Sequence, residues 1–227
     1  MRPLDNELEA LLERAGAQTG IAARLAEYGR LVLETNRRFN LTGAKSEAEL
    51  AEHIADSLTV VPYLLEPYVD VGSGAGMPAI PIAIATGIAV TMIEATAKKA
   101  RFLESTLERL GLRGTVVAQR AEIAGHEAPL REVFGCGTCR ALGSAPMVAE
   151  LLLPLIRPGG IAILQRGAIF PDERRALEDA SLMLGGRVAR EEPLEGDRRL
   201  ILIEKRGPTA LRFPRRPGIP AKRPLCF

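Results

Sequence analysis

The sequence predicts an α/β fold with a doubly wound, mostly parallel seven-stranded sheet and an N-terminal helical extension. Three observations lead to this prediction. From residue 65 onward, short strand-like runs alternate with helical segments, and such alternation builds parallel βαβ units. Residues 1–64 show only the helical spacing of apolar side chains. The last two expected strands are joined by a short turn, so they should be antiparallel.

The N-terminal segment, residues 1–64, is expected to form three helices. Two apolar stretches with helical spacing come first, and Gly16 and Gly20 separate them. Ser46 then precedes Glu49 by three residues, which is the pattern of a helix N-cap. The helix that starts there should run to about Tyr63.

The middle segment, residues 65–206, contains all the expected strands. These strands span residues 68–71, 89–94, 115–118, 133–139, 161–165, 187–192 and 198–205. Helices between them should span residues 78–86, 97–110, 146–156 and 172–184. Residues 121–130 are less regular, and a Pro-Gly-Gly turn at 158–160 should end the third of these helices.

Charge is unevenly distributed along the chain. Seven of the 30 Lys and Arg residues, and none of the 28 Asp and Glu residues, lie between Lys205 and Phe227. The chain therefore has an acidic body and a basic, Pro/Arg-rich tail at residues 207–227. Such a tail is typical of a protein that contacts a polyanion, above all nucleic acid. A terminus that only improves solubility has the same composition.

The sequence favours a soluble, cytoplasmic monomer without a metal. The N-terminus lacks the apolar stretch of a signal peptide, and the longest apolar stretch, residues 77–93, is broken by two prolines and a glycine. Cys136 and Cys139 form a C-x-x-C motif, which can serve redox chemistry or half of a zinc site. On a strand these two side chains point to opposite faces, so neither role is expected.

The loop after the first strand is the main candidate binding site. It reads Asp70-Val71-Gly72-Ser73-Gly74-Ala75-Gly76 and leads into a helix. Glycine permits positive φ and lets a ligand approach the backbone closely. The N-terminus of the helix presents free N–H groups to an anion. Either a pyrophosphate or the carboxylate of an amino-acid ligand fits such a loop, so dinucleotides and S-adenosylmethionine (SAM) are both candidates.

Three features favour SAM over a dinucleotide. The dinucleotide pattern can be matched from Gly74 onward, with Glu94 as the ribose ligand. However, Asp70 ends the strand two residues before the first glycine, where it can reach the methionine end of SAM directly or through water. The three glycines are also spaced more tightly than in the dinucleotide pattern. The late Pro-Gly-Gly turn and the closing antiparallel strands fit the sheet of SAM-dependent methyltransferases.

Acidic residues after the next two strands complete the expected cofactor site. Glu94 closes the second strand, where its carboxylate can accept hydrogen bonds from both ribose hydroxyls; the alternative is a charge at the N-terminus of the following helix. Ala121 and Glu122 follow the third strand. A backbone N–H and a polar side chain there could hold the edge of the adenine.

Several motifs together are more specific than the glycine loop. A G-x-P-x-I-P motif follows that loop directly, with N-L-T upstream and K-K-x-R-F-L downstream. These lie at residues 76–81, 40–42 and 98–103, and further matches lie at residues 36–39, 53–58, 94–97, 120–122, 140–141, 153–160 and 213–220. Over nearly its whole length the chain resembles the RsmG (GidB) family, the bacterial small-subunit (16S) ribosomal RNA guanine-N7 methyltransferases.

The resemblance implies a specific set of site residues. SAM would be bound by Gly72 and the Met77 backbone, by Glu94, Ala95 and Thr96, and by Ala121 and Glu122. The full set of expected cofactor-binding residues also includes Asp70, Gly74, Gly76 and Arg140. Arg140 would lie at the end of the fourth strand and face the methyl-transfer site and the RNA. The implied partner is small-subunit ribosomal RNA or a ribosomal particle. Two departures affect the RNA-facing side: Cys139 precedes the arginine where serine is common, and Arg166 replaces a lysine.

The chemistry requires no general acid or base. Guanine N7 carries a lone pair and no proton, so methyl transfer to it depends mainly on proximity and alignment. We expect Arg140 to be the active-site residue, with a buried ion pair as its alternative role. For His53 and Asp56, packing or capping is expected rather than catalysis. Three other functions stay open: a methyltransferase for a small molecule or protein, a non-catalytic SAM- or RNA-binding module, and an NAD-dependent enzyme.

Overall fold

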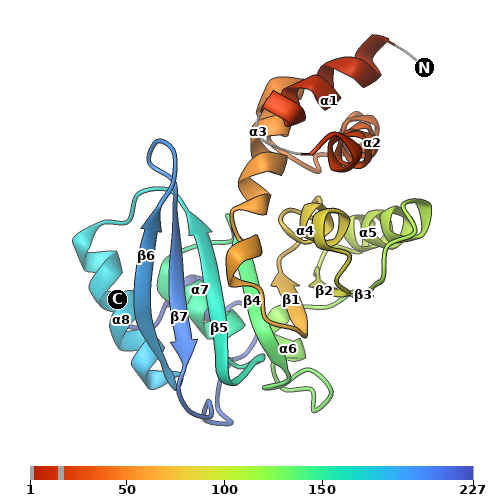
Figure 1. The fold of residues 1–227 in the computed structure, drawn as a ribbon. Helices are drawn as coiled ribbons and strands as arrows, with labels where there is room; N and C mark the ends of the chain where they lie inside the picture. Colours follow the sequence, from red (N-terminus) through yellow and green to blue (C-terminus); the bar gives the residue numbers. More distant parts are fainter. Residues whose placement is uncertain (1–2, 15–17, 227) are drawn as a thin grey trace.

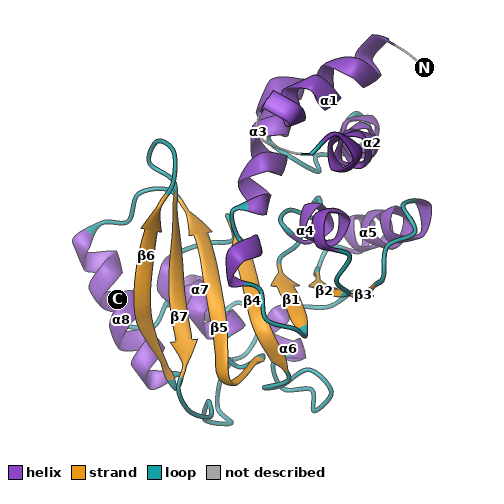
Figure 2. Ribbon diagram, in the orientation of Figure 1, coloured by secondary structure: helices purple, strands orange, loops and turns teal. Residues whose placement is uncertain are grey.

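The computed structural model describes residues 3–14 and 18–226, so Gly16 lies outside the described residues. A seven-stranded sheet lies between two layers of helices (Figures 1 and 2). The strands are β1 (Tyr68–Val71), β2 (Val90–Ile93), β3 (Gly114–Val117), β4 (Phe134–Arg140), β5 (Ile156–Arg166), β6 (Gly186–Pro193) and β7 (Arg199–Lys205). This architecture confirms the predicted fold class.

Helices cover both faces of the sheet. The helices of the described chain are α1 (Pro3–Arg14), α2 (Thr19–Asn36), α3 (Glu47–Leu58), α4 (Ala79–Thr86), α5 (Ala97–Arg109), α6 (Ala121–Ala124), α7 (Ala145–Leu152), α8 (Pro171–Met183) and α9 (Ile219–Lys222). Helix α1 packs on α2 and α3. The N-terminal helices α2 and α3 pack on α4 on one face, whereas α7 and α8 pack together on the other. The predicted N-cap is confirmed, because Ser46 Oγ accepts a hydrogen bond of 3.1 Å from Glu49 N.

The strand order is β3-β2-β1-β4-β5-β7-β6. The first five strands pair in parallel, while β7 runs antiparallel to both β5 and β6. The reversed strand therefore lies one place in from the edge of the sheet, between β5 and β6. Because parallel strands end at one edge of a sheet, the loops after β1, β2 and β4 meet there.

Two predicted boundaries were wrong. The third crossover helix, α7, ends at Leu152 rather than at residue 156, since Pro154 has no amide hydrogen with which to continue it. The expected Pro-Gly-Gly turn belongs to β5, which begins at Ile156. Phe134 pairs with Ile156 and Cys136 with Ile161, so the intervening residues form a bulge in the strand.

A third boundary was also predicted too far along the chain. Helix α3 ends at Leu58, and only a short 3-10 turn at Val61–Tyr63 follows. Pro62 lies at the start of this turn, and the residue before a proline is disfavoured in the α conformation. The segment that was expected to be irregular begins with the one-turn helix α6.

The sheet separates two apolar clusters. Cys136 contributes to the cluster beneath α2, α4 and α5, and Cys139 to the cluster beneath α7 and α8. The two cysteines thus point to opposite faces, as predicted from strand alternation. Burial raises the pKa of Cys136 to about 12, which keeps this thiol protonated.

The C-terminal segment packs back onto the domain beside α7. Glu150 on α7 is fully buried, and Arg215 donates to both of its carboxylate oxygens at distances of 2.7–3.2 Å. Phe213 and Leu225 of the same segment are also buried. Part of the basic charge of this segment therefore neutralises a carboxylate inside the protein instead of facing solvent.

This ion pair predicts a large effect of Arg215→Ala. The variant leaves the buried Glu150 carboxylate without its cation, so the free energy of unfolding should fall by about 3 kcal/mol. Denaturant unfolding measures the change. The matched control is Arg216→Ala, because Arg216 is the exposed neighbour and its replacement should cost less than about 0.5 kcal/mol. Equal unfolding free energies for the two variants would contradict this account.

Candidate cofactor and substrate site

The glycine loop adopts a backbone that needs glycine at two constrained places. Gly72 has φ +72°, and a Cβ there would lie 2.8 Å from a methyl group of Leu142. Gly76 has φ +95°, and a Cβ there would lie 2.6 Å from Ile80. The loop is therefore packed between α4 and the segment after β4. Any side chain at either position would push these elements apart.

Glu94 joins the loop after β1 to the loop after β2. Its Oε2 atom accepts a hydrogen bond of 2.9 Å from Gly74 N, and its Oε1 atom accepts one of 2.7 Å from Thr96 N. The side chain is only 6% exposed. Each carboxylate oxygen has a second lone pair, so Glu94 can hold the two loops and still accept from a pair of ligand hydroxyls.

Asp70 is a buried carboxylate that is only partly satisfied. Tyr68 donates to Thr138 Oγ1 at 2.6 Å, and Thr138 donates to Asp70 Oδ1 at 2.7 Å. The other oxygen, Oδ2, is buried without a hydrogen-bond partner among the described residues. Burial raises the pKa of Asp70 to about 7, against the lowering effect of the hydrogen bonds from Thr138 and Ser73. An ammonium group of a ligand would satisfy this oxygen and favour its charged form.

A cleft of about 300 Å³ lies beside Glu94 and the glycine loop. Of the residues predicted to bind the cofactor, seven line it together: Gly72, Gly74, Glu94, Ala95, Thr96, Ala121 and Glu122. Asp70 is buried at the base of the same loop, and Gly76 and Met77 connect the loop to α4. The acceptors at Glu94 and the orphan oxygen of Asp70 fit the ribose hydroxyls and the ammonium group of SAM.

Glu122 has two partners on the far side of this cleft. Arg120 Nη2 donates to Oε1 at 2.7 Å, and the backbone N–H of Gly218, from the C-terminal segment, donates to the same oxygen at 2.8 Å. Burial alone would raise the pKa of Glu122, but these hydrogen bonds outweigh it and lower the pKa. The C-terminal segment is thus attached directly to the wall of the cofactor cleft.

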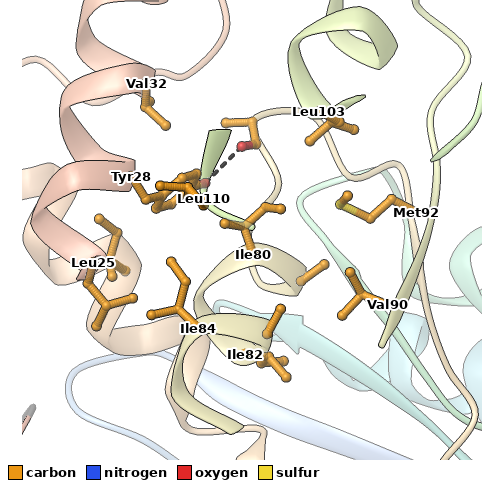
Figure 3. Close-up of a cluster of buried hydrophobic side chains, with 14 of the residues drawn as sticks. Leu25, Tyr28, Val32, Ile80, Ile82, Ile84, Val90, Met92, Leu103 and Leu110 are labelled. Atoms are coloured by element: carbon orange, nitrogen blue, oxygen red, sulfur yellow. Dashed lines mark hydrogen bonds between the residues drawn. The ribbon is translucent and has the colours of Figure 1, made fainter. Parts of the chain in front are cut away.

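Helix α2 supports the glycine loop from behind. Tyr28 is fully buried, and its hydroxyl donates a hydrogen bond of 2.8 Å to Ala75 O. Figure 3 shows Tyr28 between Leu25 and Val32 of α2, opposite Ile80 and Ile84 of α4. The N-terminal helices therefore help to fix the position of the cofactor loop.

Arg140 does not line the cofactor cleft. It lines a neighbouring cleft of about 270 Å³, where its Nη1 donates to His53 O at 2.9 Å and lies 3.5 Å from Asp56 Oδ2. Ala141 lines both clefts and has φ +52°, an uncommon conformation for a residue with a side chain. The two clefts thus meet at the turn that follows β4.

The sequence did not single out several of these contributors. Tyr28, Thr138 and Gln165 carry no motif signal of their own, because each acts through a contact with a distant segment. Asp56, for which packing or capping was expected rather than catalysis, lines the cleft of Arg140 and lies 3.5 Å from that arginine.

Metal-binding clusters and membrane-spanning helices are both absent from the described part of the chain. Within residues 3–14 and 18–226, no group of three or more His, Cys, Asp or Glu side chains is placed to hold a metal ion. In the same part of the chain, no helix has both the length and the apolar character needed to span a bilayer.

Known proteins resemble this chain in sequence along nearly its whole length. The family model described as rRNA small subunit methyltransferase G matches residues 21–201. The chain belongs to this family. A relative from Deinococcus deserti, named ribosomal RNA small subunit methyltransferase G, is 39% identical and is aligned over 94% of this chain and 95% of its own length. One with the same name from Rubrobacter xylanophilus is 40% identical over 88% of this chain and 82% of its own.

Solved structures agree on the fold of this methyltransferase family member. An O-methyltransferase from Bacillus cereus, in complex with SAH, superposes with a TM-score of 0.56. It is 20% identical in sequence, and the match covers 79% of this chain and 91% of that one. This likeness supports the fold alone.

The Asp70 carboxylate predicts a pH dependence of SAM binding. Because the ammonium group of SAM favours ionised Asp70, the complex binds fewer protons than the free protein. Affinity should therefore rise with pH up to about 7, by at most about tenfold per unit, and then level off. Calorimetric titrations in two buffers of different ionisation enthalpy measure the released proton. Asp70→Asn is the control, and this variant should bind SAM more weakly and lose the pH dependence. If the variant keeps the pH dependence, Asp70 is not the group that causes it.

Removing the Glu94 carboxylate should weaken SAM binding by more than tenfold. The variant Glu94→Ala loses the acceptor of the ribose hydroxyls and the two hydrogen bonds that hold the loops. Dissociation constants from calorimetry provide the comparison. Glu104→Ala is the matched control, since Glu104 is exposed on α5. Full affinity in Glu94→Ala would argue against the assigned contact.

Proposed function

We propose that this family member transfers a methyl group from SAM to N7 of a guanine in small-subunit ribosomal RNA. The observation that supports this most is the meeting of two clefts at Ala141. One of them is lined by Glu94, with Asp70 buried at the base of the loop that borders it, and the other contains Arg140. The relatives' printed names support ribosomal RNA as the substrate, and the resemblance in motifs supports guanine N7 as the methylated atom.

The residues of the chain contribute binding and alignment. SAM, when bound, supplies an electrophilic methyl group on its sulfonium. Glu94 and Asp70 would hold the ribose and the ammonium group, and the closely packed glycine loop would position the cofactor near the turn at Ala141. Guanine N7 has a free lone pair, so no residue has to remove a proton. Proximity and alignment of this kind lower the barrier without a catalytic acid or base.

Charged side chains near the guanine that accepts the methyl group also affect the rate of transfer. The purine ring becomes positively charged as N7 accepts the methyl group, so a carboxylate near the ring stabilises the transition state. Asp56 supplies such a carboxylate in the cleft of Arg140. The arginines around that cleft offer contacts to the RNA. Because the substrate is ribosomal RNA, the proposal includes a cytoplasmic location, and we propose that the enzyme acts as a monomer.

Mapping of small-subunit ribosomal RNA tests the proposed function. RNA from a strain that lacks the protein should lose one N7-methylguanine, detected by mass spectrometry of nuclease digests, and a plasmid copy should restore it. Purified protein with radiolabelled SAM should label small-subunit particles from that strain at the same position. If the RNA of both strains contains the same amount of N7-methylguanine, the ribosomal assignment is refuted.

The labelling assay also separates the alternatives. A module that only binds SAM or RNA would leave no label on the particle. A methyltransferase for a small molecule or protein would label that fraction of a cell extract instead of the RNA.

A further inference from the structure

The cleft that contains Arg140 lies at the carboxyl ends of β4 and β5, against α3 and the turn before β7. Its polar lining consists of Asp56, Arg140, Gln165, Arg166, Arg198 and Arg199. It shares Ala141 with the cofactor cleft. A methyl acceptor must lie beside the cofactor, so this cleft is in the right place for the acceptor base.

Asp56 is a buried acceptor in this cleft. It is 8% exposed, and its two carboxylate oxygens lie 3.5 Å from Arg140 Nη1 and 3.3 Å from Arg198 Nη1. Both distances exceed the usual length of a charge-assisted hydrogen bond. The arginines therefore neutralise Asp56 without using all its lone pairs. It can still accept hydrogen bonds from a ligand.

Gln165 provides a second acceptor close to the first. Its side chain is 4% exposed, and its Nε2 donates a hydrogen bond of 3.0 Å to the backbone oxygen of Asp56. That bond fixes the amide, and Oε1 is left buried without a partner among the described residues. A buried polar atom without a partner costs stability unless a ligand or a water satisfies it. The cleft thus contains an acceptor that needs a donor.

These groups match one edge of guanine. The Watson–Crick edge of guanine has two donor groups, N1–H and the N2 amino group, followed by one acceptor, O6. We propose that Asp56 and Gln165 accept hydrogen bonds from N1–H and the N2 amino group, while an arginine donates to O6. Asp56 and Gln165 are then the residues that select guanine. This inference rests on the proposed function and names the part of the protein that reads the base.

Adenine and phosphate fit the cleft less well. Adenine has an acceptor at N1, which would face the Asp56 carboxylate and repel it. A phosphate diester has no hydrogen-bond donor for Asp56 or for Gln165 Oε1, and Arg140 and Arg198 already pair with the Asp56 carboxylate. The reaction also strengthens the hydrogen bond from guanine N1–H, because methylation at N7 makes N1–H a stronger donor. The bond to Asp56 therefore strengthens in the transition state, which raises kcat rather than only lowering KM.

Inosine at the modified position tests this inference, because inosine differs from guanosine only in lacking the N2 amino group. The substrates are small-subunit particles reconstituted with RNA that carries either base. We expect wild-type protein to lose at least about tenfold in kcat/KM on inosine. Gln165→Met should lose activity on guanine and discriminate less between the two bases, because Gln165 accepts from the N2 amino group that inosine lacks. Asp56→Asn should lose activity on both bases, because both carry the N1–H that Asp56 accepts. Both variants should bind SAM with unchanged affinity.

Glu52→Gln is the matched control, because Glu52 is exposed on the same helix as Asp56. It should retain both the activity and the discrimination of the wild type. If Gln165→Met loses activity equally on guanine and inosine, or if Asp56→Asn keeps full activity on both, the two side chains do not read the base and the inference is wrong. A uniform loss that grows steeply with salt would assign the cleft to phosphate instead. If wild-type protein methylates no guanine in the particles, both the proposed function and this inference are wrong.

Discussion

Glu94 accepts hydrogen bonds from Gly74 N and Thr96 N, and these two bonds hold together the two loops that line the cofactor cleft. The bonds can form because Val71 pairs with Ile93 at the ends of β1 and β2, which brings loops 20 residues apart in the sequence to one edge of the sheet. Burial of the carboxylate makes this junction rigid. The glycine loop, the start of α5 and the wall of the cleft all take their positions from it.

Helices from outside the methyltransferase core complete the site. Tyr28 on α2 fixes the glycine loop through Ala75 O, and Asp56 on α3 pairs with Arg198 at 3.3 Å in the cleft of Arg140. The C-terminal segment reaches the cofactor cleft through Gly218 N and Glu122. The two ends of the chain therefore shape opposite sides of the site, and neither is merely attached to the surface of the core.

Local patterns predicted the parts of the fold that depend on local physics. Strand alternation correctly separated Cys136 from Cys139, and the spacing of Ser46 and Glu49 located the start of α3. The glycine loop was recognised because positive φ limits which residues can occupy it. The end of α7 was predicted wrongly because the apolar pattern continued past Pro154, and the bulge in β5 is determined by pairing with β4.

Long-range contacts explain what the sequence could not predict about the site. Tyr28 and Ala75 are 47 residues apart, and Gln165 and Asp56 are 109 apart. No periodicity or spacing marks such pairs. The basic C-terminal segment shows the same limit, since composition predicted a polyanion contact but could not reveal that Arg215 neutralises the buried Glu150. The positions of Asp70 and Glu94 were easier to anticipate, because both lie at strand ends within recognisable motifs.

A crystal structure with bound S-adenosylhomocysteine tests the central claim most directly. The account predicts both ribose hydroxyls within hydrogen-bond distance of the Glu94 carboxylate, and the amino group of the ligand at Asp70 Oδ2. It also predicts that the sulfur faces the turn at Ala141, where the two clefts meet. A ligand bound with its ribose away from Glu94, or with its sulfur away from Ala141, would contradict the account.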